Sequence, residues 1–217
     1  MTKFYFVRHG QTEWNLERRF QGGNGDSELL PSSYADMKKV GEFLSDVKFA
    51  HIYASPIKRA RITATKIAQY LKDTPALSLR SNLAEVSLGE WEGELVANVQ
   101  ERYPKAYDNY RHDLDHFEGQ EFGGEGYTKA TNRFVRVIKD IAQQYPNDNI
   151  LIVSHGMALS FGLNGLLQQP RMSIRERGGL SNTSTTVLST VDGEHYQIED
   201  WNNTSYLNKK QDDSTTI

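Results

Sequence analysis

Short apolar runs alternate with longer amphipathic segments over most of the chain. Three runs rich in β-branched and aromatic residues, bounded by turn residues, have the pattern of buried strands in a parallel sheet; they are residues 3–7, 49–54 and 149–153. Apolar residues at helical spacing predict helices between and after them, at residues 33–45, 56–71, 127–145 and 157–167. Strands that alternate with helices indicate a layered α/β domain.

The remaining segments have other patterns. Residues 183–201 alternate around Asp192-Gly193, which predicts a β-hairpin. Residues 92–126 are charged, rich in aromatic residues and interrupted by glycines, and we expect a helical insert, or lid, over one end of the sheet. Residues 206–217 are polar and are expected to form a frayed tail. Residues 1–205 are then a single domain.

Length, charge and composition mainly exclude classes of protein. The 217 residues are enough for one domain with a sizeable core. With 25 Lys and Arg against 28 Asp and Glu, the net charge of −3 gives no pull toward nucleic acid or an anionic membrane. No apolar run approaches the roughly 18 residues of a membrane span, the first residues predict a strand rather than a secretory signal, and Cys is absent. We therefore expect a cytoplasmic protein without a nucleic-acid or membrane partner, and its oligomeric state stays open.

Cationic and donor side chains follow the three predicted parallel strands. The first strand ends in Arg8-His9-Gly10 and the third in Ser154-His155-Gly156. Arg59 lies in the first turn of the helix that Ser55-Pro56 is expected to start, with Ser55 as its N-cap. Ligands of open α/β sheets bind beyond the carboxyl ends of the strands, so these residues are candidates for one site. So many cationic and donor groups, desolvated together, favour an anionic ligand.

Each of these signals also has a simpler interpretation. A lone histidine at a strand end is more often a hydrogen-bonded structural residue than a catalytic one. An arginine in a first helical turn is usually solvated, and its charge opposes the helix dipole there. The convergence of several such groups at neighbouring strand ends is what favours the functional interpretation.

Five motifs carry a resemblance to a known family. They are Arg8-His9-Gly10-Gln11-Thr12-Glu13-Trp14-Asn15, Ser55-Pro56-Ile57-Lys58-Arg59-Ala60 with Thr63-Ala64, Leu83-Ala84-Glu85 with Gly89-Glu90-Trp91-Glu92-Gly93, Ser154-His155-Gly156, and Asn182-Thr183-Ser184. In this order they resemble the histidine phosphatase superfamily, also called phosphoglycerate mutase-like. The resemblance spans nearly the whole chain. It implies a three-layer α/β/α fold with a mostly parallel central sheet and a helical insert over the C-terminal ends of the strands.

The resemblance also implies a nucleophile and its partners. His9 takes the place of the family's nucleophilic histidine, which forms a phosphohistidine and divides a hydrolysis into two steps. The attacking nitrogen must be neutral, so we expect the other ring nitrogen to donate to a backbone carbonyl and Arg8 to disfavour the imidazolium. Arg8, Arg59 and His155 are expected to hold the phosphoryl oxygens, with Asn15 as a further donor. No metal and no other cofactor is implied.

Glu85 matches the acid of the family. It is expected to protonate the leaving oxygen and then to take a proton from the water that attacks the phosphohistidine. Without the resemblance, Glu85 is more simply interpreted as a loop residue paired with a surface Lys or Arg. Gln21 and Gly22 are expected to border the substrate pocket.

The insert bears on the choice between phosphatase and mutase. Mutases of this family carry a paired-Arg segment that grips a second acidic group, whereas Arg102, Lys105 and Arg111 here have no adjacent partner. The aromatic residues of the insert suit either a rim for partly apolar substrates or simple packing; they are Tyr103, Tyr107, Tyr110, Phe117 and Phe122. We therefore expect a metal-independent phosphomonoesterase that hydrolyses small phosphorylated metabolites. The alternatives are a cofactor-dependent phosphoglycerate mutase and a non-catalytic phosphate-binding protein.

Overall fold

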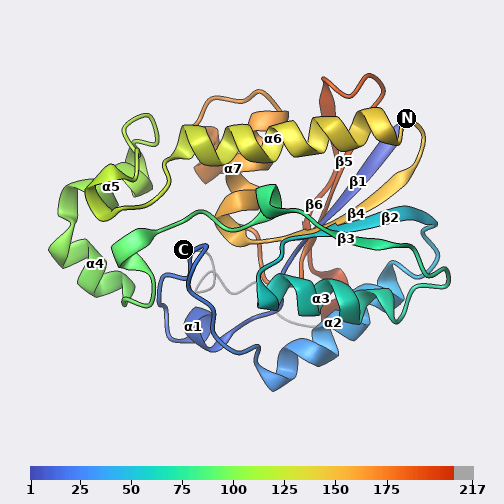
Figure 1. The fold of residues 1–217 in the computed structure, drawn as a ribbon, viewed down its shortest axis with the longest axis horizontal. Coiled ribbons are helices and arrows are strands. Elements are labelled where there is room, and N and C mark those ends of the chain that lie inside the picture. Colours follow the sequence, from blue (N-terminus) through green and yellow to red (C-terminus); the bar gives the residue numbers. More distant parts are fainter. Residues whose placement is uncertain (208–217) are drawn as a thin grey trace.

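The computed structural model describes residues 1–207, which form an α/β fold on one six-stranded sheet (Figure 1). The strands are β1 (Thr2–Arg8), β2 (Phe49–Ala54), β3 (Leu77–Leu79), β4 (Asn149–Ser154), β5 (Thr185–Thr190) and β6 (Tyr196–Asn203). Their order is β3-β2-β4-β1-β5-β6, in which β3, β2, β4 and β1 are parallel. The predicted hairpin is confirmed as β5 and β6; β5 pairs antiparallel with β1, and β6 pairs antiparallel with β5.

Helices cover both faces of this sheet (Figure 1). They are α1 (Glu13–Leu16), α2 (Pro31–Phe43), α3 (Lys58–Ala68), α4 (Val96–Arg102), α5 (Pro104–His112), α6 (Tyr127–Gln144), α7 (Gly156–Leu166) and α8 (Ser173–Glu176). Along β4, Ile150 and Ile152 join the apolar cluster of α6 and α7. Leu151 and Val153 join the cluster of α2 and α3 instead. The two-residue period of a strand thus serves two helix layers, which confirms the three-layer architecture.

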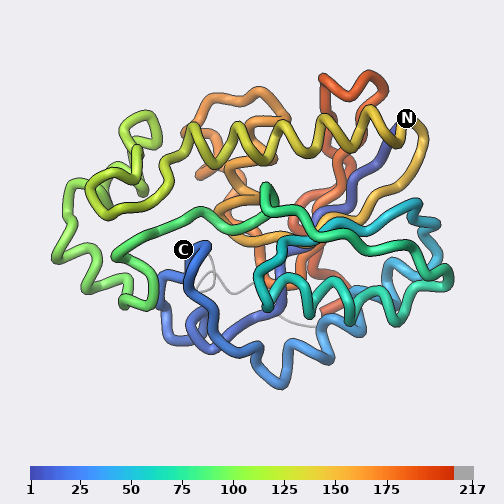
Figure 2. The backbone as a smooth tube through the Cα atoms, viewed as in Figure 1, coloured from blue at the N-terminus to red at the C-terminus, as the bar shows by residue number. Residues whose placement is uncertain are grey.

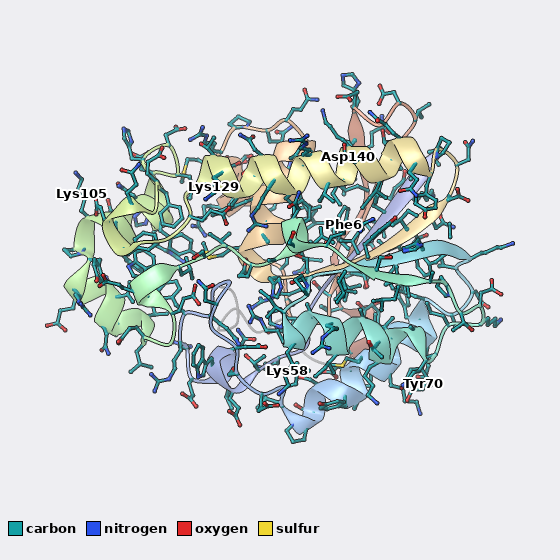
Figure 3. All side chains as sticks on the ribbon, in the orientation of Figure 1. Phe6, Lys58, Tyr70, Lys105, Lys129 and Asp140 are labelled. Carbon is teal, nitrogen blue, oxygen red and sulfur yellow. The ribbon has the colours of Figure 1, made fainter. Side chains whose placement is uncertain are left out.

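Strand β1 lies in the middle of this arrangement. Phe6 is buried and packs on Phe134 of α6, with ring centroids 6.2 Å apart. Figure 3 shows Phe6 at the centre of the molecule, whereas Lys105 and Lys129 are exposed. Because β1 is central, the residues that follow it lie near those of β4, its parallel neighbour.

Two element boundaries differ from those that the sequence predicts. Helix α3 begins at Lys58 with Ile57 as its N-cap residue, so the expected start at Pro56 is wrong, and Ser55 is not the cap. The Ser55 hydroxyl instead accepts from Ile57 N and contacts a histidine of the site. Strand β3 has no clear pattern in the sequence because it is a short edge strand whose side chains are half-buried or exposed.

The insert forms one end of the molecule (Figure 1). It contains α4, α5 and a 3-10 turn at Gln120–Phe122. Tyr110, Phe117 and Phe122 are buried and lie around Trp91; the ring of Phe122 stacks on that of Trp91 at 4.1 Å. Of the two roles open to the insert's aromatic residues, these three show packing.

The C-terminal tail begins later than expected. Tyr206 stacks on Phe43 with a centroid distance of 4.5 Å, and Leu207 is buried, so the expected fraying is wrong for these two residues. The rest of the predicted tail, 208–217, lies outside the described residues. Within residues 1–207, no helix has the length and apolar character required to cross a bilayer.

Candidate active site

The site lies at the carboxyl ends of β1 and β4. Arg8 pairs with Ser154 in the parallel register, and the His9 N–H donates to Ser154 O at 3.0 Å. This register brings the rings of His9 and His155 to a centroid distance of 5.1 Å, and both side chains are buried. The expected convergence of the two strand ends is confirmed.

His9 has a defined proton position. Its Nδ1 donates to Gly10 O at 2.7 Å, because a carbonyl oxygen can only accept. Nε2 then carries a lone pair, which accepts from Arg59 Nε at 3.2 Å. Burial lowers the pKa of His9 well below its usual value, and the charges of Arg59 and Arg8 lower it further. The ring is therefore neutral, with a backbone carbonyl at its second nitrogen, as expected.

Arg59 is buried, unlike most arginines in a first helical turn. Its Nη2 donates to Gly22 O at 3.0 Å, and its Nη1 donates to Gly25 O at 2.9 Å and to Asp26 Oδ1 at 3.1 Å. Glycine at position 22 lets this loop pack against Leu88 and Glu92, since a Cβ would lie 2.5 Å from Glu92 Oε1 and 2.9 Å from Leu88 N. Burial lowers the pKa of Arg59, and neighbouring carboxylates oppose that shift. Gly22 thus contributes a carbonyl that holds Arg59.

Arg8 supplies a second buried guanidinium. Its Nη1 donates to Leu180 O at 2.6 Å. Burial lowers the pKa of Arg8 to about 10, with Glu85 acting to raise it and Arg59 to lower it. Arg8 therefore stays cationic at neutral pH, and two arginine charges lie close to the His9 ring.

His155 presents to the site the opposite ring nitrogen from the one that His9 presents. Ser55 Oγ accepts from Ile57 N and lies 2.7 Å from His155 Nε2. We assign Ser55 as the donor in this second bond, because its hydroxyl proton has no other acceptor among the bonds within residues 1–207. With Nε2 as the acceptor, the neutral ring is protonated at Nδ1, which is buried and has no partner within residues 1–207. Burial lowers the pKa of His155 well below its usual value, and the charge of Arg59 adds to the shift. His155 therefore offers an unused N–H donor.

Asn15 and Gln21 both line the pocket but use their amides differently. Asn15 Oδ1 accepts from Thr12 N at 3.2 Å and from Asn182 Nδ2 at 3.4 Å. Among the bonds within residues 1–207, none uses the Asn15 Nδ2, which is left as a donor. Gln21 Oε1 accepts from Thr12 Oγ1 at 2.7 Å, and its Nε2 donates to Ser27 Oγ at 3.2 Å. Asn15 thus presents a donor, whereas the Gln21 amide orders its loop.

Glu85 lies between β3 and α4, against the N-terminus of α7. Its carboxylate accepts from the backbone N–H groups of Val86 at 2.9 Å, Ala158 at 2.7 Å and Met157 at 3.2 Å. A helix N-terminus is a favourable place for an anionic group. The side chain is only 6 % exposed, so the structure does not support the alternative of a solvated residue paired with a surface Lys or Arg.

A small cavity lies among these groups. Of the residues expected from the sequence, Arg8, His9, Asn15, Gln21 and Glu85 line it. Arg59 and His155 are buried beside His9. The other residues that line the cavity are Arg19, Phe20, Leu88, Gly156, Met157, Ser160, Gly179 and Leu180. Within the described part of the chain, no lining residue comes from 92–126, so the insert does not form the wall of this cavity.

Sequence reasoning missed two residues that hold the histidines. Ser55 bonds His155, which follows it by 100 residues, and Asn182 Nδ2 donates to His9 O at 2.9 Å across 173 residues. The available signals were the motifs that contain them and their positions, because Ser55 follows a predicted strand and Asn182 precedes one. Neither signal indicates which histidine the residue will contact.

Comparison with known proteins assigns the family. The model of the histidine phosphatase superfamily (branch 1) matches residues 4–204. Phosphoglycerate mutase-like protein 4 of Arabidopsis thaliana is 33% identical over 205 residues, which cover 93% of this chain and 85% of that protein. The structure of Bacillus stearothermophilus YhfR has a TM-score of 0.87 at 27% identity and covers 95% of this chain and 100% of its own. Phosphoserine phosphatase from Entamoeba histolytica, solved with 3-phosphoglyceric acid, has a TM-score of 0.80 at 30% identity, with the same coverage. The chain therefore belongs to the histidine phosphatase superfamily and is a phosphatase.

Proposed function

We propose that this phosphatase hydrolyses small phosphate monoesters through a phosphohistidine at His9, without a metal ion. The observation that carries the proposal is the state of the His9 ring, which is neutral, protonated on Nδ1 and bonded through the Nε2 lone pair to Arg59. A nitrogen in this state is a competent nucleophile. Phosphoryl transfer otherwise needs positioning and positive charge, which the two buried arginines supply.

In the first step, the Nε2 lone pair of His9 attacks phosphorus in line. The Nε2–P bond forms as the bond from phosphorus to the leaving oxygen breaks. The phosphoryl group replaces Arg59 Nε–H at this lone pair, and the guanidinium donates to a phosphoryl oxygen instead. Arg8, the Nδ1–H of His155 and the amide of Asn15 donate to the oxygens as well. Protonated Glu85 gives its proton to the leaving oxygen, so the product departs as an alcohol.

In the second step, water attacks the phosphohistidine. Glu85, now a carboxylate, takes a proton from the water as the new O–P bond forms. The Nε2–P bond breaks, and its electron pair returns to the ring. Inorganic phosphate leaves, His9 is neutral again, and Glu85 carries the proton that it took from the water. The backbone N–H groups at the start of α7 hold the Glu85 side chain in place.

The cavity supports small phosphorylated metabolites as the substrate class. Phe20, Leu88 and Met157 contribute apolar walls, and Ser160 adds a hydroxyl. The Entamoeba relative was solved with 3-phosphoglyceric acid, a molecule of this class. The mutase alternative is favoured by the names of relatives, among them the Arabidopsis protein and the probable phosphoglycerate mutase GpmB of Salmonella, which is 30% identical over 203 residues. In this chain the insert's Arg102 pairs with Glu90 at the surface, and it does not line the cavity.

Two broader expectations stay part of the proposal. Residues 1–205 act as one domain with 92–126 as its helical insert, and the protein works in the cytoplasm. The single six-stranded sheet, which contains strands from β1 to β6, supports the single domain. The absence of Cys is in keeping with the cytoplasm. Cell fractionation with an antibody against the protein tests the location.

The deciding experiment is hydrolysis of p-nitrophenyl phosphate in excess EDTA, beside isomerisation of 3-phosphoglycerate with and without 2,3-bisphosphoglycerate. Turnover in EDTA without isomerisation is expected. Rapid quenching in base should trap a phosphoenzyme that is stable to base and labile to acid, on the peptide that contains His9. Primer-dependent isomerisation with little hydrolysis would make the protein a mutase. Phosphate binding without turnover would make it a binding protein.

A further inference from the structure

Every backbone carbonyl of residues 82–87, the segment that contains Glu85, accepts a hydrogen bond from another part of the fold. After the 3-10 turn at Ser81–Leu83, the chain has no helix or strand up to residue 88, and Figure 2 shows this stretch crossing from the sheet to the insert. Six consecutive carbonyl groups nevertheless accept hydrogen bonds from other parts of the fold; they belong to Asn82, Leu83, Ala84, Glu85, Val86 and Ser87.

Arg133 of α6 donates to three of these six carbonyls. Its Nη1 donates to Asn82 O and Ala84 O, both at 2.8 Å, and its Nη2 donates to Glu85 O at 3.1 Å. The other two N–H bonds go to one carboxylate, with Nε to Glu125 Oε1 at 2.9 Å and Nη2 to Glu125 Oε2 at 2.8 Å. A guanidinium has five N–H donors in one plane, and all five are used here.

The remaining carbonyls are bonded by groups of other elements. Ser154 Oγ at the end of β4 donates to Leu83 O at 2.8 Å. Gly23 N donates to Val86 O at 3.0 Å, and Glu125 N donates to Ser87 O at 2.7 Å. Glu125 therefore acts twice. Its backbone N–H donates to Ser87 O, and its carboxylate fixes the plane of the Arg133 guanidinium, whose five N–H bonds we call the fork. Its side chain is 8 % exposed and that of Arg133 is 19 % exposed, so water competes little for these bonds.

We propose that Arg133 is a positioning residue for the acid–base chemistry of Glu85; the inference rests on the proposed function. Arg133 does not line the cavity. It fixes the main chain on both sides of Ala84, and so the point from which the Glu85 carboxylate reaches the cavity. Without the fork, three carbonyls lose their donor and the segment must shift to satisfy them. A displacement of about 1 Å at a catalytic group can cost about 100-fold in rate.

Two esters separate positioning of the acid from general damage. The leaving group of p-nitrophenyl phosphate needs little protonation, whereas that of glycerol 2-phosphate needs a proton. Arg133→Met should lower kcat/KM, which reports formation of the phosphohistidine and not its hydrolysis, by about 10- to 100-fold for glycerol 2-phosphate and by much less for p-nitrophenyl phosphate.

Matched variants separate the fork from its charge. Arg133→Lys should not restore the glycerol 2-phosphate activity, because a single ammonium nitrogen cannot reproduce the planar fork. Arg136→Met removes an exposed arginine of the same helix and should leave both activities unchanged. Full rescue by Arg133→Lys would show that charge alone is needed and would overturn the positioning role.

A double-variant cycle with Glu85→Gln gives the decisive readout. If Arg133 acts through Glu85, the double variant should hydrolyse glycerol 2-phosphate no more slowly than Glu85→Gln alone. Equal losses for both esters in Arg133→Met, or multiplied losses in the double variant, would overturn the inference while leaving the proposed function in place. Equal losses for both esters in Glu85→Gln itself would overturn the proposed role of Glu85, and this inference with it.

Glu125→Gln keeps the inference testable if Arg133→Met does not fold. The amide keeps the side-chain volume and the backbone bond to Ser87, but it faces one guanidinium N–H with a donor of its own. We expect a smaller loss with the same preference for the better leaving group. Equal losses for both esters in this folded variant would overturn the positioning role of the fork.

Discussion

The ends of β1 and β4 share a pattern but present opposite ring nitrogens to the site. In each, a buried histidine and then a glycine follow a parallel strand, and the centroids of the two rings lie 5.1 Å apart. Burial and arginine charge hold the pKa of both well below the usual value. His9, however, donates its Nδ1–H to Gly10 O and presents the lone pair of Nε2. His155 is assigned as accepting from Ser55 at Nε2, and it presents its Nδ1–H.

The difference comes from partners that the shared pattern does not contain. Gly10 O belongs to the residue next to His9, so the strand end itself sets that tautomer. Ser55 stands at the end of β2 and reaches His155 only because β2 and β4 pair in the sheet. The group at the second ring nitrogen therefore decides whether a strand-end histidine offers a lone pair or a proton.

Removal of the lone pair should have the largest effect. His9→Ala should reduce turnover of p-nitrophenyl phosphate to background, because no other group at the site is placed to attack phosphorus. Inorganic phosphate should still bind, since Arg59 keeps its bonds to Gly22, Gly25 and Asp26. Steady-state kinetics and phosphate titration by calorimetry measure the two quantities. Appreciable residual turnover would place the nucleophile elsewhere.

Removal of the proton donor should cost less than removal of the nucleophile. His155→Ala should lower kcat by about 100- to 1,000-fold, the range found when one donor to a developing charge is lost. A phosphoenzyme should still form at His9, more slowly, and rapid quenching with peptide mapping detects it. If His155→Ala lost the phosphoenzyme and His9→Ala kept it, the roles assigned to the two strand ends would be reversed.

Much of the fold was predictable because the signals were local. Apolar runs bounded by turn residues marked β1, β2 and β4, and the Asp-Gly turn marked the hairpin of β5 and β6. Strand β3 was not predicted, because three partly exposed residues at a sheet edge are too few to show a pattern of apolar and polar positions. The start of α3 was misplaced because Ser55 is turned toward His155, a partner that only the folded sheet supplies.

The site was predictable as a set of residues rather than as a network. Motif and strand-end position indicated His9, His155 and Glu85, and the structure brings them together around the start of α7. The burial of Arg59 could not be anticipated, because its partners are backbone carbonyls of a distant loop. The fork of Arg133 was hidden for the same reason, since no side-chain pattern reveals which carbonyls will need a donor.

Loss of the serine that sets the second tautomer should have a moderate effect. In Ser55→Ala, His155 Nε2 loses its donor, so the ring proton is no longer held at Nδ1. We expect kcat/KM to fall by about 3- to 10-fold, which corresponds to one hydrogen bond of about 1 kcal/mol. Nitrogen-15 NMR of the imidazoles should show a changed tautomer for His155 and an unchanged one for His9. Ser189→Ala, at a buried serine bonded to Glu199, is the control.

The smallest effect tests what the two histidines share. A histidine whose pKa is lowered on folding binds fewer protons in the native than in the unfolded chain, so stability falls as the pH drops below the unfolded value of 6.5. Each ring should contribute a slope of up to about 1.4 kcal/mol per pH unit, lost toward its lower native pKa. Urea unfolding from about pH 7 to pH 5 should therefore show a shallower fall in His9→Asn and in His155→Asn than in the unchanged protein, by similar amounts. An unchanged slope in either variant would mean that folding does not lower the pKa of its ring, and the two strand ends would then differ in charge at acidic pH as well as in the ring nitrogen that they present.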